Sequence, residues 1–203
     1  MIEPSDLLTP AEAAAASGMA VRAVYRRAAE RLPKGVVVRR DGEMFLTTVG
    51  AICLRLDRDM PKDVPSSVRR LLYGRMGAHG ADRAEVGEGG FRYVVDPKSA
   101  AAEVGRFLSD YRKAMELIVE DPGVQGGAAT FRGTRLMVHH VADLVAQGTD
   151  AAELAEDYPG LTPDMIAAAS VYARTHPRRG RPRKPGWRRV SPVSEVRRPR
   201  ATA

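Results

Sequence analysis

The chain has 203 residues and a formal net charge of +7, and the charged side chains are spread unevenly along it. The net charge is +4 over residues 1–77, −7 over residues 78–173 and +10 over residues 174–203. A hydrophobic content of 44% excludes a chain that is disordered throughout. No apolar run approaches the roughly 18 residues that a membrane helix needs, and the N-terminus lacks the pattern of a signal peptide. We therefore expect a cytoplasmic protein without a membrane partner.

Residues 1–77, which we call the first block, contain closely spaced helices and strands. The capping box at residues 9–12, with Pro10 at the first helical position, begins a helix that Ser17-Gly18 ends. A second helix is expected from about Ala20 to Leu32. The Asp41-Gly42 pair between two apolar stretches predicts a β-hairpin over residues 36–47. Two further helices, over residues 49–58 and 66–76, complete the block.

After six glycines within residues 74–90, a second set of elements begins. A short strand is expected over residues 91–95 and a long helix over residues 98–117. Apolar residues at spacings of three and four along this helix indicate either packing on its own domain or a dimer seam. They are Val104, Leu108, Tyr111, Met115 and Ile118. Three shorter helices follow, over residues 138–147, 151–157 and 163–174.

The second helix of the first block has an arginine-rich face. Ala14, Gly18 and Val24 match the spacing of a helix-turn-helix, in which a small residue allows close helix crossing and glycine allows the turn. The hairpin that follows resembles the wing of a winged helix-turn-helix. An ordinary solvated face is the alternative for the arginines alone, whereas the combination favours DNA binding as a dimer on two half-sites. The candidate DNA-binding residues are Arg22, Arg26, Arg27, Arg31, Arg39 and Arg40.

The most specific stretch of the chain lies between residues 118 and 174. It contains Asp121-Pro122-Gly123-Val124, then Gly126-Gly127, then Arg132-Gly133-Thr134-Arg135, followed by segments of short helices. Over about 55 residues this stretch resembles a family of VapB-type antitoxins from bacterial toxin–antitoxin systems. The resemblance implies a protein that represses its own operon and inhibits a cognate PIN-type ribonuclease toxin. Residues 128–131 depart from the Lys-Pro that often follows the paired glycines in that family. Without the family, these glycines and arginines are expected to form structural turns.

The C-terminal segment is basic and rich in proline, so we expect it to be disordered until it binds a partner. One interpretation is toxin neutralisation, in which arginines pair with the Mg²⁺-binding carboxylates of the nuclease and Trp187 anchors the interface. Another is an AT-hook, because residues 177–185 match the motif that enters an A·T-rich minor groove. A tail that only improves solubility is the third. The candidate toxin-binding residues are Arg178, Arg179, Arg181, Arg183, Trp187, Arg188 and Arg189.

Side chains that could support catalysis or metal binding form no complete site. The single cysteine, Cys53, lies in an apolar run and is expected in a core. His139 and His140 are adjacent, so on a helix they point about 100° apart and cannot share a metal. No nucleophile or partner base accompanies the acidic residues Glu153, Glu156 and Asp157. We therefore expect neither an enzyme, a metal site nor a cofactor.

These observations predict a mainly α fold with small β elements. A winged helix-turn-helix is expected at residues 1–77, a glycine-rich linker at 78–90, a small helical antitoxin and dimerisation domain at 91–174, and a toxin-binding tail at 175–203. The expected partners are operator DNA, a PIN-type ribonuclease toxin and a second copy of the chain. The alternative is a transcriptional regulator with an AT-hook-like tail and no toxin.

Overall fold

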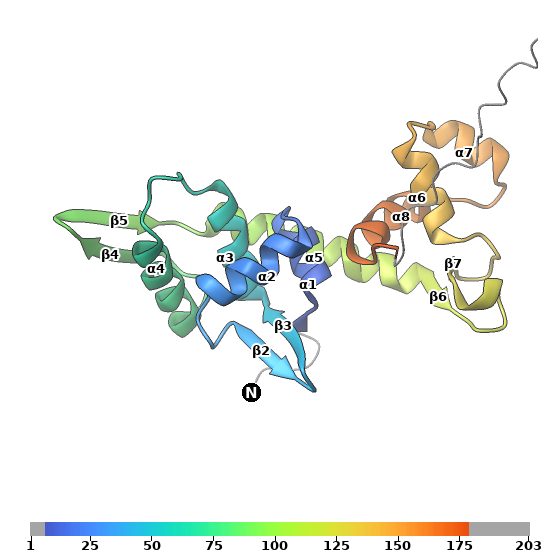
Figure 1. Ribbon diagram of the computed structural model, residues 1–203. Helices are drawn as coiled ribbons and strands as arrows, with labels where there is room; N and C mark the ends of the chain where they lie inside the picture. The colour runs from blue at the N-terminus through green and yellow to red at the C-terminus, as the bar shows by residue number, and fades with distance from the viewer. Residues whose placement is uncertain (1–6, 179–203) are drawn as a thin grey trace, which may run out of the picture.

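The computed structural model describes residues 7–178, in which eight α-helices accompany three small antiparallel sheets (Figure 1). The protein is mainly α with small β elements, as the sequence predicts. In chain order the elements are β1 (Leu7–Leu8), α1 (Pro10–Ser17), α2 (Val21–Glu30), β2 (Val37–Arg40), β3 (Glu43–Thr47), α3 (Thr48–Asp59), α4 (Ser66–His79), β4 (Ala84–Glu88), β5 (Phe91–Val95), α5 (Lys98–Leu117), β6 (Ile118–Glu120), the 3₁₀ turn η2 (Gln125–Gly127), β7 (Ala129–Phe131), α6 (Val138–Ala146), α7 (Ala151–Asp157) and α8 (Pro163–Thr175).

Helices α1 and α2 form a pair joined by a short turn. The Thr9 side chain accepts a hydrogen bond from the backbone of Glu12, and the Glu12 carboxylate accepts one from the backbone of Thr9. This capping box begins α1 as predicted. Gly18 ends the helix in the left-handed conformation, with φ of 69°, and its backbone N–H donates to the carbonyl of Ala14. Ala14 and Val24 are both buried between the elements of this region.

The hairpin that follows α2 is the predicted one. Strands β2 and β3 pair in antiparallel register, with Arg40 opposite Glu43 and Arg39 opposite Met44. Asp41 and Gly42 both have positive φ, as a two-residue type I′ turn requires. β1 pairs with the other edge of β3, so β3 is the central strand of a three-stranded sheet.

Residues 78–90 do not form the predicted linker. α4 continues to His79, and β4 pairs with β5 as a second hairpin whose turn is Gly89-Gly90. Ala84 and Val86 are buried against the same core as α1 to α4. The glycines in this region therefore lie in regular elements and in a tight turn. The turn favours glycine because two consecutive residues at the hairpin tip have positive φ.

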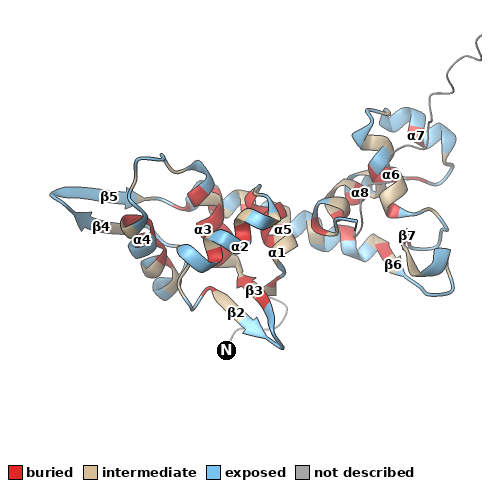
Figure 2. Cartoon of the chain, viewed as in Figure 1, coloured by how far each residue is buried: buried red, intermediate tan, exposed pale blue. Residues whose placement is uncertain are grey.

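The buried hydrophobic residues form two clusters, which define a first lobe (residues 7–108) and a second lobe (residues 114–178). Helix α5 runs through both (Figure 1). The predicted boundary at residues 78–90 is therefore wrong, since the division falls within α5. Figure 2 shows buried segments in each lobe with an exposed stretch of α5 between them.

The apolar seam along α5 is used within the chain. Val104 and Leu108 pack in the core of the first lobe, and Ile118 packs in that of the second. The Tyr111 hydroxyl donates a hydrogen bond to the Glu12 carboxylate at 2.7 Å. Packing within the chain, one of the two predicted alternatives, is confirmed for these residues, whereas Met115 is 37% exposed.

None of the helices described between residues 7 and 178 has the length and apolar character required to cross a membrane.

Candidate nucleic-acid interface

The six predicted DNA-binding arginines divide into two groups in the structure. Arg22 and Arg26 are exposed on successive turns of α2, and Arg39 and Arg40 are exposed on the β2–β3 hairpin. Arg27 and Arg31 instead point toward the protein, and their side chains are only 22% and 16% exposed. Both are among the candidate DNA-binding residues, but in the structure a buried carboxylate binds them.

That carboxylate belongs to Asp57 on α3. It lies 2.9 Å from the Nε atom of Arg27, 2.7 Å from Arg31 and 3.2 Å from Arg69. The hydroxyl of Tyr73 also donates to it at 3.2 Å. Burial raises the pKa of this tyrosine, and the negative charge of Asp57 raises it further. We call this group the Asp57 cluster; it fixes α2 to α3 and α4.

Sequence analysis missed this cluster because its partners are far apart in the chain. Arg27 and Arg31 lie one helical turn apart, so a single carboxylate can bind both. The sequence signal is the position of Asp57 one helical turn after Cys53 and Leu54, because aspartate is unusual on the buried face of a helix. The consequence for the site is that α2 is held rigidly while Arg22 and Arg26 remain free to contact a ligand.

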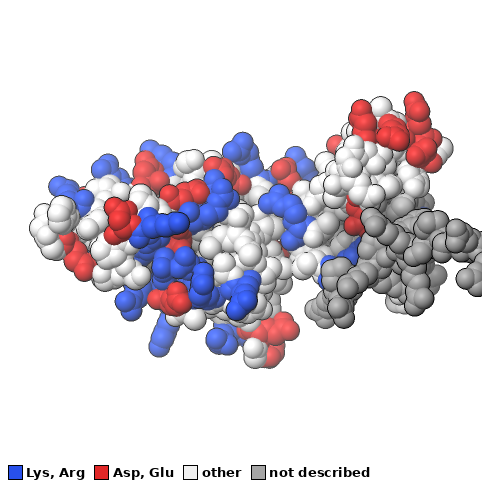
Figure 3. Space-filling model, turned by 45° about the horizontal axis from the view of Figure 1, so that its top comes forward, with Lys and Arg blue, Asp and Glu red and all other residues white. Residues whose placement is uncertain are grey.

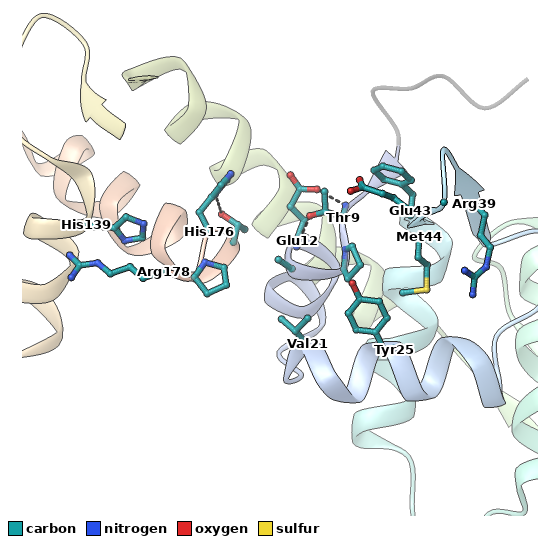
Figure 4. Close-up of a pocket in the computed structure, with 16 residues that line it drawn as sticks. Thr9, Glu12, Val21, Tyr25, Arg39, Glu43, Met44, His139, His176 and Arg178 are labelled. Atoms are coloured by element: carbon teal, nitrogen blue, oxygen red, sulfur yellow. Dashed lines mark hydrogen bonds between the residues drawn. The ribbon is translucent and has the colours of Figure 1, made fainter. Parts of the chain in front are cut away.

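A cleft of about 970 Å³ separates α2 and the hairpin tip from the second lobe. Tyr25, Arg39 and Met44 line it from the first lobe, whereas His139 and His176 line it from the second (Figure 4). We call it the interlobe cleft. Tyr25 is 52% exposed on α2. An aromatic ring beside exposed arginines is suited to contact with a nucleic-acid backbone or base.

The two lobes are joined by polar and aromatic contacts at one side of this cleft. The Arg174 guanidinium donates to the carbonyl of Ala15 at 2.7 Å and lies over the ring of Phe107, 5.0 Å from its centroid. The His176 ring stacks on the ring of Tyr111 of α5 with a centroid distance of 6.3 Å. These contacts place the end of α8, where the basic tail begins, against α1.

Only one of the predicted toxin-binding residues lies in the described part of the chain. Arg178 is exposed and forms an ion pair with Asp143 at 2.7 Å. Burial lowers the pKa of the nearby His139, and the positive charge of Arg178 lowers it further. The other candidates lie outside the described residues, namely Arg179, Arg181, Arg183, Trp187, Arg188 and Arg189.

Charged side chains gather differently on the two lobes. Figure 3 shows many Lys and Arg side chains over the first lobe, with Asp and Glu side chains among them, whereas the far end of the second lobe shows a group of Asp and Glu side chains. Helix α7 contributes Glu153, Glu156 and Asp157, all exposed. The first lobe is therefore the better candidate for contact with phosphate.

The stretch of glycines and arginines that begins at Asp121 forms turns in the second lobe. The Asp121 carboxylate accepts a hydrogen bond from the backbone of Gly123 at 2.8 Å, and Gly126 and Gly127 have positive φ. The hydroxyl of Thr134 accepts from the backbone of Leu136 and donates to the carbonyl of Phe131, which fixes the bend before α6. These hydrogen bonds pair backbone N–H and C=O groups at the points where the loop reverses direction.

The side chains of the two adjacent histidines contact different residues in the structure. His139 lies edge-on to Tyr172, and the Nε2 atom of His140 lies 2.9 Å from the hydroxyl of Tyr158. Within residues 7–178, no three His, Cys, Asp or Glu side chains are grouped so that they could hold a metal ion.

Comparison with known proteins finds similarity over part of the chain. Residues 118–173 match the family described as "Protein of unknown function (DUF433)". Over 76 residues the chain is 40% identical to the uncharacterized protein y4eO of Sinorhizobium fredii. This match covers 37% of the chain and 34% of y4eO, so the chain spans about a third of the relative's length.

A comparison of folds finds the crystal structure of Rv2018 from Mycobacterium tuberculosis. It is 17% identical in sequence, and the match covers 81% of this chain and 97% of that one with a TM-score of 0.32.

Proposed function

We propose that the first lobe is a winged helix-turn-helix that binds double-stranded DNA. In this proposal α2 enters the major groove and the β2–β3 hairpin contacts the neighbouring backbone. The observation that carries it is the division of the arginines, because Arg27 and Arg31 anchor α2 while Arg22 and Arg26 remain exposed beside the hairpin. A rigidly held helix that presents two free arginines is suited to reading base edges or phosphates.

Binding to the DNA upstream of the gene tests this proposal. Fluorescence anisotropy of the full chain is measured at several salt concentrations, with a scrambled duplex as the competitor. The double variant Arg22→Ala/Arg26→Ala is expected to weaken binding and to reduce the salt slope by about 2 if both side chains contact phosphate. Arg135→Ala, an exposed arginine of the second lobe, is the matched control and is expected to bind as the unchanged protein does. Equal affinity of the double variant would remove α2 from the interface.

We also propose a wider role as the antitoxin of a toxin–antitoxin pair, which acts in the cytoplasm and represses its own operon. The family match at residues 118–173 supports it, because it covers the stretch that resembles VapB-type antitoxins. The net charge of +10 over residues 174–203 also supports it. Arginines of this tail would pair with the carboxylates of a PIN-type ribonuclease and exclude Mg²⁺ or RNA from them.

Ribonuclease inhibition distinguishes the antitoxin from a regulator that has no toxin. The neighbouring reading frame is expressed and its RNA cleavage is measured with the full chain and with a chain that ends after Arg178. The full chain is expected to inhibit and the shortened chain to lose inhibition. Undiminished inhibition by the shortened chain would exclude the tail. A neighbouring protein without nuclease activity would favour the regulator, whose tail binds an A·T-rich minor groove.

A further inference from the structure

The β4–β5 hairpin leaves one edge of a sheet unpaired. β5 pairs with β4 on one side, and no strand among residues 7–178 pairs with its other edge. Figure 1 shows this hairpin extending from α4 at the end of the first lobe that is distant from the second lobe. Exposed strand edges with apolar side chains favour pairing with another chain. Here Phe91 is 70% exposed and Val94 is 42% exposed.

The turn determines which backbone groups of β5 are free. Gly89 and Gly90 have φ values of 60° and 80°, as in a two-residue type I′ turn. In such a turn the residues that flank it, here Glu88 and Phe91, are joined by a backbone hydrogen bond. Because hydrogen-bonded and non-hydrogen-bonded pairs alternate along an antiparallel ladder, the N–H and C=O groups of Arg92 and Val94 point away from β4.

The sequence of β5 is complementary to itself in one antiparallel register. With a two-fold axis at Tyr93, Arg92 lies opposite Val94 of a second copy, so the free backbone groups of both strands pair. Phe91 then lies opposite Val95 of the second copy, and Tyr93 lies opposite its counterpart. Aromatic residues opposite β-branched or aromatic residues are favourable cross-strand pairs, and this register places no like charges opposite each other.

A groove beside β5 has room for the exposed ring. It has a volume of about 260 Å³ and lies between β5 and the loop that follows α3. Its lining is almost entirely apolar and includes Leu56, Met60, Val64, Leu72 and Val95. Paired residues on antiparallel strands project from the same face of the sheet. Phe91 of a second copy, opposite Val95, is therefore directed toward this groove.

We propose that two copies of the chain associate through the β5 edge, antiparallel and two-fold symmetric about Tyr93, with Phe91 of each copy seated in the apolar groove of the other. The two hairpins then form a continuous four-stranded sheet. A two-fold interface of this kind uses the same surface on both chains and closes after two copies. This interface does not depend on DNA binding, so the experiments below test it separately from the proposed function.

Cysteine cross-linking tests the register. At a non-hydrogen-bonded pair the Cα atoms lie about 4.5 Å apart, within the range that a disulfide spans. Tyr93→Cys is therefore expected to form a disulfide-linked dimer as the main species under mild oxidation, with twice the mass of the 22.0 kDa chain. Cys53 does not compete, since its side chain is fully buried.

Two further single variants test the neighbouring registers. Arg92→Cys and Val94→Cys would lie on the axis only if the strands were shifted by two residues, so both are expected to remain largely uncross-linked. The proposed interface would be overturned if either of these variants cross-linked more than Tyr93→Cys, or if none of the three variants cross-linked.

Sedimentation equilibrium tests the role of the ring. Phe91→Asp is expected to raise the dimer dissociation constant by at least about 30-fold, as for an interface hot spot. Met115→Asp is the matched control, because Met115 is an exposed hydrophobic residue of α5 outside the interface, and it is expected to leave the dimer intact. An unchanged dimer in Phe91→Asp would overturn the proposal. Loss of the dimer in a chain that ends after Arg178 would do the same, since it would assign association to the tail.

Discussion

At the scale of single residues, Asp57 connects more elements than any predicted site residue. Its buried carboxylate binds Arg27 and Arg31 from α2 and Arg69 and Tyr73 from α4. Arg69 also donates to the carbonyls of Pro61 and Val64, which closes the loop between α3 and α4. A buried charge is tolerated only when such partners replace its hydration. The presentation of Arg22 and Arg26 on α2 therefore depends on a buried residue of another helix.

Asp57→Asn should destabilise the first lobe strongly. The substitution removes the negative charge that three guanidinium groups share, for which a loss of about 3–5 kcal/mol is expected in the free energy of unfolding. Urea denaturation followed by circular dichroism measures it. Asp59→Asn is the control, because its side chain is 51% exposed, its partner Arg58 is 44% exposed and its other partner Arg55 keeps an ion pair with Glu103; a change below about 1 kcal/mol is expected there. Similar losses for both variants would contradict a special role of Asp57.

Cys53 should be unreactive in the folded protein. Burial, and secondarily the charge of Asp57, raise the pKa of its thiol to about 12. The unfolded thiol ionises near pH 8.5, so the folded state holds the proton more tightly. This contribution to stability is complete below about pH 8.5 and declines as the pH rises toward 12.

A thiol reagent added at pH 8 checks this expectation. The native protein should show almost no labelling, and one equivalent should react once urea unfolds the chain. Rapid labelling of the native protein would show that Cys53 is accessible.

At the scale of elements, the turn between α1 and α2 depends on Gly18. Its φ of 69° is costly for residues with a Cβ, and an added Cβ would lie 2.1 Å from the Nη1 atom of Arg58. The guanidinium can move aside, so the backbone conformation sets the main cost. Gly18→Ala should lower the free energy of unfolding by about 1–2 kcal/mol.

Thermal unfolding measures this loss, with Gly105→Ala as the control. Gly105 lies within α5, and an added Cβ there would meet no atom within 4 Å. This control is expected to be neutral or slightly stabilising, because alanine favours helix. An equally stable Gly18→Ala would contradict the assignment of the turn.

Local signals predicted the elements well, and long-range contacts explain where the prediction failed. Thr9 with Glu12 and Asp41 with Gly42 encode a helix start and a hairpin within a few residues, and the structure has both. The glycines of residues 74–90 suggested a linker by composition, whereas Gly77 allows close packing on Pro33 and Gly89-Gly90 forms a turn. The salt bridges of Arg27 and Arg31 depend on Asp57, 26 residues or more along the chain, and no local pattern indicates them.

At the scale of the whole molecule, α5 and a small set of contacts connect the first lobe, which we propose binds DNA, to the second lobe, which contains the stretch that matches the DUF433 family. α5 supplies Val104 and Leu108 to the first core and Ala114 to the second. Tyr111 and Arg174 add hydrogen bonds to α1 from α5 and α8. Because the helix is continuous and its middle is anchored, unfolding of one lobe disturbs the other. We therefore expect the two lobes to unfold together.

The double variant Tyr111→Phe/Arg174→Ala should make the two lobes unfold independently of each other. It removes the hydrogen bonds to Glu12 and to the carbonyl of Ala15, as well as the contact of the guanidinium with Phe107. A hydrogen bond that involves a charged group contributes about 1.5–3 kcal/mol; since Arg174 is exposed, the lower part of that range applies.

Differential scanning calorimetry measures the outcome. The unchanged protein should show one transition and the double variant two, with the second lobe's secondary structure retained. Arg112→Ala, an exposed arginine of α5, is the control and should keep a single transition. A single transition in the double variant would show that α5 alone couples the lobes. Two transitions would place the coupling in side chains next to the point where the basic tail begins, so that a partner bound to the tail could act on α1 through α8.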